Sequence, residues 1–184
     1  MLKGAGLVAI AVVSGLIWFL IRHQDAPAKV ADTPPQNTGA YTFTKVLGPV
    51  KSDDCAAKSS SDTKRFFQEN PCQSLSRALY TTETGGKKVL VSVVLVGMPD
   101  SAKAKQLKTL TEQDGTGNVT DLVMDGTYKA SGAPRVGGKT AAYAGQVSGA
   151  NVTIVLAEFY GKHTDDDLLQ RVAQDAVRLS ADLK

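Results

Sequence analysis

The sequence predicts an α+β domain with a mainly antiparallel sheet of about five to six strands and two to three helices, preceded by one N-terminal transmembrane helix. Three observations lead to this prediction. An uncharged apolar run covers residues 4–21, two pairs of strand-like segments are each joined by a tight turn, and the chain ends in an amphipathic helix. The 184 residues, 42% of them hydrophobic, are enough for one domain with its own core.

The apolar run Gly4–Ile21 contains no charged residue. As a helix rising about 1.5 Å per residue it would be roughly 27 Å long, close to the ~30 Å of a bilayer core. Lys3 precedes it, and Trp18 suits the far membrane interface. We therefore expect residues 1–23 to be a signal-anchor that holds the protein in the membrane as a single-pass protein. Signal-peptide cleavage near Ala28, followed by secretion, is the alternative.

Residues 24–40 are rich in Pro, Ala, Asp and Thr and carry almost no large apolar side chain. Such a segment cannot bury enough surface to offset the entropy of ordering, so we expect a flexible stalk. Residues 41–184 then form the folded domain, which we expect on the extracytoplasmic side.

Cys55 and Cys72 are the only cysteines. An even count in a chain expected to leave the cytoplasm predicts a disulfide, which would stabilise the fold by about 3 kcal/mol in the chain-entropy model. A redox pair would more naturally be C-x-x-C, and two cysteines with two distant histidines do not make a zinc site. No metal site is predicted.

The domain begins with a strand over residues 41–50, where apolar and polar residues alternate, and Gly48–Pro49 is expected to end it. A short helix is expected over residues 62–70, because a capping residue precedes it and Pro71 stops it.

The clearest signal is a hairpin that pairs residues 75–84 with residues 87–98 across Gly85–Gly86. Two glycines supply the positive φ angles of a tight turn. The second strand is apolar on both faces and rich in valine, which is typical of a central strand covered on both sides.

A helix capped by Asp100 or Ser101 is expected to run to about Gln113. A short strand over residues 119–124 and a Gly-rich basic loop over residues 125–139 are expected to follow. Long loops of this kind are often functional or mobile.

A second hairpin pairs residues 140–148 with residues 151–160 across Gly149–Ala150. The final helix covers residues 165–183, where apolar residues recur every three and four positions. Its three leading aspartates, residues 165–167, are interpreted as capping charge, because no calcium loop surrounds them.

No common catalytic arrangement occurs in the sequence. The two histidines, His23 and His163, have no recognisable nucleophile or metal motif beside them. We therefore predict no catalytic residue and no cofactor, and lean against an enzyme. The net charge of +3 is too mild and too evenly spread for nucleic-acid binding.

The leading hypothesis is a membrane-anchored protein whose extracytoplasmic domain binds a ligand or senses one without catalysis. Its layout resembles that of small membrane-tethered sensor or substrate-binding domains of bacteria. The predicted ligand-binding residues are Lys129, Arg135 and Lys139, with Arg77 as a further candidate. The partner would be another membrane or envelope protein, or a cell-envelope polymer.

Two other interpretations stay open. In the first, the protein is an accessory subunit of a larger membrane assembly, because glycine and alanine residues in Gly4–Ile21 offer small surfaces for helix packing. In the second, it is a hydrolase-type enzyme with a site assembled from scattered carboxylates.

Overall fold

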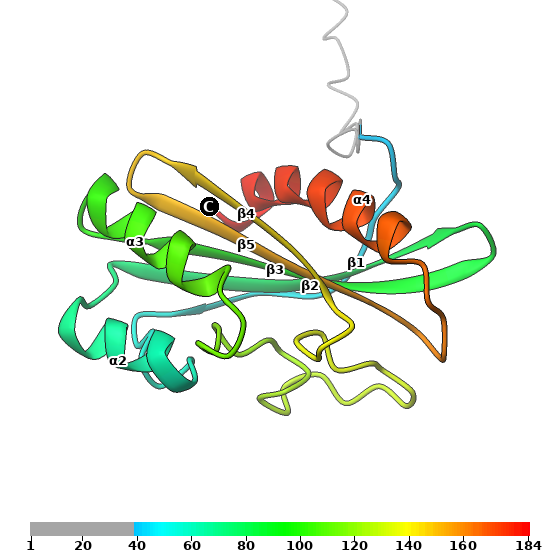
Figure 1. The fold of residues 1–184 in the computed structure, drawn as a ribbon, viewed down its shortest axis with the longest axis horizontal. Helices are drawn as coiled ribbons and strands as arrows, with labels where there is room; N and C mark the ends of the chain where they lie inside the picture. The colour runs from blue at the N-terminus through cyan, green and yellow to red at the C-terminus, as the bar shows by residue number, and fades with distance from the viewer. Residues whose placement is uncertain (1–38) are drawn as a thin grey trace, which may run out of the picture. The chain divides into compact units, whose positions relative to one another are not determined.

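An antiparallel sheet of five strands organises residues 39–184, the part of the chain that the computed structural model describes (Figure 1). In sequence order the strands are β1 (Thr44–Ser52), β2 (Ser74–Thr84), β3 (Lys87–Gly97), β4 (Ala142–Ser148) and β5 (Asn151–Phe159). They lie side by side in the order β1-β2-β3-β5-β4, and every neighbouring pair is antiparallel. The predicted α+β class with an antiparallel sheet is confirmed.

Both predicted hairpins are confirmed. β2 and β3 pair without a register shift across Gly85 and Gly86, whose φ angles of 57° and 70° are positive as the turn requires. β4 and β5 pair in the same way across a turn that contains Gly149. Strand β3 lies at the centre of the sheet and is buried on both faces, as its sequence predicts.

The prediction that Gly48–Pro49 ends the first strand is wrong. β1 continues to Ser52, and its register with β2 shifts between Leu47 and Val50. Proline is tolerated there because β1 is an edge strand, where one row of N–H groups needs no partner. Gly48 has a φ of 95°, and a Cβ at this position would lie 2.6 Å from the carbonyl oxygen of Arg77.

The helices are α2 (Ser61–Glu69), α3 (Ser101–Thr111) and α4 (Asp166–Ala176), followed by the 3₁₀ helix η1 (Val177–Leu183). Two predicted caps form: Asp100 accepts a hydrogen bond of 2.8 Å from the N–H of Lys103, and Asp165 accepts one of 3.1 Å from the N–H of Leu168. The cap predicted for the helix at residues 62–70 is wrong, because α2 already begins at Ser61 and its N-cap Ser60 makes no side-chain capping hydrogen bond. The final helix, expected as one unit, tightens to 3₁₀ geometry at Val177, a common change at helix ends.

The sheet is covered on both faces, which gives three layers (Figure 1). On one face, alternate residues of the strands pack against α4 and η1, for example against Leu169 and Val172. On the other face, α2 and α3 contribute Phe67 and Leu107. The remaining part of that second face is covered by the α3–β4 connection, residues 112–141.

The predicted disulfide is present. Cys55 and Cys72 are joined, and the bond closes the segment that contains α2. Cys55 is itself buried in the core cluster beneath α2 and α3. A structural disulfide indicates an oxidising environment, either extracytoplasmic or secreted.

The predicted membrane span Gly4–Ile21 lies outside the described residues, as does nearly all of the predicted stalk. Within residues 39–184, no helix has the length and apolar character to cross a bilayer.

The described chain enters the domain beside α4. The N–H groups of Ala40 and Tyr41 donate to the carboxylate of Asp175 at 3.2 and 3.0 Å, and Arg178 donates to the carbonyl of Tyr41 at 2.8 Å. Gly39 fits closely against the Arg178 guanidinium, since a Cβ there would overlap it. These contacts fasten the start of the domain to its last helical layer.

Candidate ligand-binding site

The α3–β4 connection contains no helix or strand, yet it is packed onto the sheet. Its residues Leu122 and Val136 are fully buried and form one core cluster with Leu79, Leu90 and Leu156 of the sheet. Burial of these apolar side chains is the physical reason that so long a segment without regular structure keeps one conformation.

Arg77 ties the connection to β2. Its side chain is 2% exposed, and Nη1 donates to the carbonyl of Thr120 at 2.7 Å and to Oδ2 of Asp125 at 2.8 Å. Burial alone would raise the pKa of Asp125, but hydrogen bonds from Thr127 and Arg77 together with the positive charge of Arg77 hold that pKa below its usual range. This buried ion pair therefore fixes the middle of the connection.

Asp121 turns the chain where a strand over residues 119–124 was expected. Its Oδ1 accepts hydrogen bonds from the N–H groups of Val123 and Met124 at 2.7 and 3.0 Å. A side chain that bonds to nearby backbone competes with strand pairing. The strand prediction is wrong: this stretch makes only an isolated bridge between Val119 and Ser59.

The other carboxylate oxygen of Asp121, Oδ2, has no hydrogen-bond partner within residues 39–184. The residue is 1% exposed, and burial raises the pKa of its carboxyl group. A buried, unsatisfied acceptor is costly for a fold and common at functional sites.

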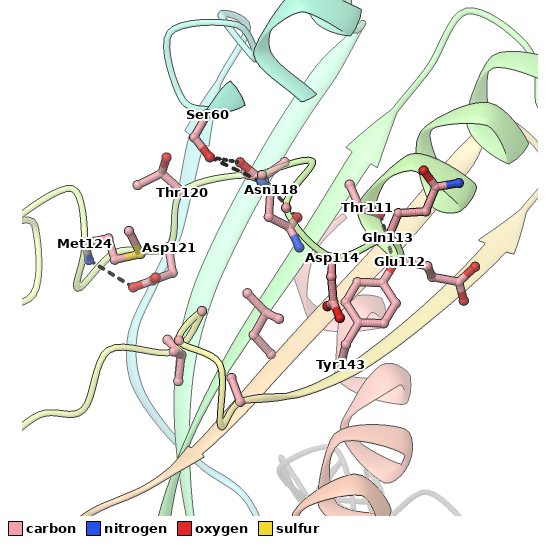
Figure 2. A pocket seen from close by; sticks show the side chains of 18 residues that line it. Ser60, Thr111, Glu112, Gln113, Asp114, Asn118, Thr120, Asp121, Met124 and Tyr143 are labelled. Carbon is pink, nitrogen blue, oxygen red and sulfur yellow. Dashed lines mark hydrogen bonds between the residues drawn. The ribbon is translucent and has the colours of Figure 1, made fainter. Parts of the chain in front are cut away.

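Asp121 lines a pocket of about 220 Å³ between the end of α3, the connection and the inner side of β4 and β5 (Figure 2). In this view Asp121 lies at one side of the pocket, and Tyr143 and Glu112 lie at the other. The lining holds three carboxylates, from Glu112, Asp114 and Asp121, and neither lysine nor arginine. Its other polar side chains are those of Ser60, Thr111, Gln113, Asn118, Thr120 and Tyr143.

Tyr143 forms a fixed wall of this pocket. Its hydroxyl lies 2.9 Å from Oγ1 of Thr111, and Gly145 leaves room for its ring, because a Cβ at Gly145 would collide with it. Burial, assisted by the charge of Glu112, raises the pKa of Tyr143 to about 12, and the hydrogen bond between Tyr143 and Thr111 opposes this rise. The phenol is therefore neutral at physiological pH and able to donate a hydrogen bond.

The sequence-predicted site residues lie elsewhere. Lys129, Arg135 and Lys139 are exposed members of the same connection, and none of them lines the pocket. Arg77 does not join them at the surface, because its guanidinium is buried against the connection. Ligand binding by these four residues stays a prediction.

The pocket residues come from distant parts of the sequence. Thr111 is the last residue of α3, Asp121 lies at a turn, and Tyr143 lies near the start of β4. No local sequence motif therefore identifies them. The one available sequence signal is a pair of aspartates. Asp121 interrupts the otherwise apolar stretch 119–124, and Asp125 directly follows that stretch.

Comparison with protein-family models, with curated proteins and with solved structures finds no match for this chain. The site is therefore interpreted from its own geometry. Within the described part of the chain, no three His, Cys, Asp or Glu side chains gather in a way that could hold a metal ion.

Proposed function

We propose that this chain is a membrane-anchored, non-catalytic binding protein whose domain lies outside the cytoplasm and holds a small polar ligand without negative charge in the pocket. The observation that carries this proposal is the charge of the lining: three carboxylates and no basic side chain.

Electrostatics select the ligand class. Glu112 is paired with Lys108, which does not line the pocket, so Asp114 and Asp121 are the lining carboxylates without an ion-pair partner. A phosphate or carboxylate placed beside these two would meet like charges, and the partly enclosed site would weaken their screening. Hydroxyl and ammonium groups donate hydrogen bonds, which is what carboxylate oxygens accept. The volume is below the roughly 300–1,000 Å³ of sites for drug-sized ligands, which favours a small molecule or the end of a longer one.

The site supports binding rather than catalysis. Neither Cys nor His lines the pocket. Asp121, its most buried carboxylate, already uses one oxygen to hold its own turn. Glu112 and Asp114 also line the pocket, but Glu112 is already paired with Lys108. A general acid–base pair would have to be held around a reacting atom.

The disulfide supports an extracytoplasmic domain. Gly39 lies in the α4 layer, whereas the pocket lies on the opposite face of the sheet.

The test uses three compounds with the same six-membered ring that carry a hydroxymethyl, an aminomethyl or a carboxylate group. Titration calorimetry on the full-length chain should give binding of the first two and at least about tenfold weaker binding of the carboxylate. Asp114→Asn should lower the affinity for the amine several-fold, whereas Asp167→Asn, an exposed aspartate at the start of α4, should not. Tightest binding of the carboxylate, or binding of none of the three, would overturn the proposal.

A further inference from the structure

We propose that the ligand is a linear, uncharged glycan, with one sugar unit in the pocket and the following units in a second cavity along the edge of β4. This inference rests on the proposed function, and it adds the chemical class of the ligand and its direction of extension.

The second cavity has a volume of about 430 Å³ and follows the free edge of the sheet. Strand β4 supplies Gln146 to its lining, and α4 supplies Gln170 and Gln174. Glu112 is its only charged lining residue. The cavity is thus bordered by side-chain amides at the junction of two layers.

The two cavities adjoin each other, because Glu112 and Tyr143 line both of them. Tyr143 is held by Thr111 and forms the partition. The side chain of Glu112 is 40% exposed and is paired with Lys108, so a ligand that occupies both cavities would cross over this ion pair beside the tyrosine.

Sugar hydroxyls both donate and accept hydrogen bonds, and amide side chains do the same. A chain of hydroxyl-bearing rings matches both linings. Three glutamines line one cavity, and amide, hydroxyl and carboxylate groups line the other. Neither lining contains lysine or arginine, and Lys108, which contacts Glu112 from outside the linings, is already paired with that carboxylate. An acidic polysaccharide therefore has no free counter-charge in either cavity. The geometry therefore points to an uncharged glycan.

An extended peptide could reach the same edge by adding a strand to β4, which requires free backbone groups along the edge. One of these groups is already taken, since Nε2 of Gln170 donates to the carbonyl of Tyr143 at 2.9 Å. This contact removes one backbone acceptor that an added strand would use, which favours a ligand that binds through side chains.

The experiment measures how affinity depends on glycan length. Full-length protein in a sugar-free detergent is titrated with neutral oligomers of glucose and of N-acetylglucosamine, one to four units long, and with carboxylate-bearing analogues. For at least one neutral series, we expect about tenfold tighter binding of three units than of one. Replacing the two exposed amides together, Gln146→Ala with Gln174→Ala, should remove that gain and leave single-unit binding unchanged.

Gln106→Ala provides the matched control, because Gln106 is an exposed glutamine on α3 that lines neither cavity. Affinity that does not change with length would overturn the inference and leave the proposed function standing. Absence of glycan binding, preference for the acidic analogues, or loss of the gain in the control variant would also overturn it. Preference for acidic ligands of every size would remove the proposed function as well.

Discussion

At the scale of single residues, the most informative group is the carboxyl of Asp121. One oxygen closes a turn and the other has no partner within residues 39–184, so a single side chain both shapes the connection and leaves an acceptor beside the pocket. Burying a charge without full compensation costs stability, and that cost depends on pH.

Because burial raises the pKa of Asp121, the folded protein binds this proton more tightly than the unfolded chain does. The resulting penalty is absent below the unfolded pKa of about 4, grows as the pH rises, and is complete above the folded pKa. Asp121→Asn removes the charge, so its free energy of unfolding relative to wild type should increase between about pH 4 and pH 7. Urea unfolding at several pH values measures this difference. A difference that stays flat, or that favours wild type as the pH rises, would contradict the assignment.

At the scale of elements, the α3–β4 connection behaves as a layer of the fold although it has no regular secondary structure. It is attached to the sheet by the buried Leu122 and Val136, by partly buried apolar side chains such as that of Tyr128, and by the ion pair of Arg77 with Asp125. The apolar contacts are non-directional, whereas the contact of Arg77 with Asp125 sets the position of the turn.

Arg77→Met keeps an unbranched side chain but leaves Asp125 without its buried partner. We expect a loss of about 3 kcal/mol in the free energy of unfolding, together with faster proteolysis inside the connection. Arg135→Met is the matched control, because this arginine is exposed in the same segment and should change stability by less than about 0.5 kcal/mol. Equal effects of the two substitutions would show that Arg77 does not anchor the connection.

The elements also show how far the sequence could predict the fold. Both hairpins were predictable because Gly85–Gly86 and the β-branched strands are local signals. The continuation of β1 past Pro49 was not, because it depends on which strand lies beside it and on its place at the edge. The strand expected at residues 119–124 failed because the Asp121 side chain outcompetes strand pairing for the local N–H groups.

The pocket itself could not be predicted from the sequence. It is made by bringing Thr111, Asp121 and Tyr143 together across three elements, and its chemistry depends on burial and on which oxygen lacks a partner. The sequence draws attention instead to the charges of Lys129, Arg135 and Lys139, because clustered charge is visible without a fold.

At the scale of the whole molecule, we propose a protein in which a membrane anchor precedes an extracytoplasmic binding domain. The disulfide supports the extracytoplasmic or secreted location of the domain. The anchor itself is predicted from Gly4–Ile21 alone.

Alkaline carbonate washing of native membranes tests the anchor. An integral single-pass protein stays in the pellet, and mass spectrometry of its peptides should recover Gly4–Ile21 in the mature chain. Release into the supernatant with a new N-terminus near Ala28 would instead show cleavage and secretion. Non-reducing digestion of the same sample should give the peptide pair joined through Cys55 and Cys72.

The hydrogen bonds that join Ala40 and Tyr41 to Asp175 and Arg178, together called the clamp, have a mechanical consequence. Tension applied to the chain before Gly39 reaches α4 first, so these hydrogen bonds must break before force acts on the end of β1. When an edge strand is pulled from one end, its hydrogen bonds to the neighbouring strand break one pair at a time. A sheet resists force applied in this way least. By passing the force to α4, which packs mainly on β4 and β5 at the other side of the sheet, the clamp protects β1 from being peeled away.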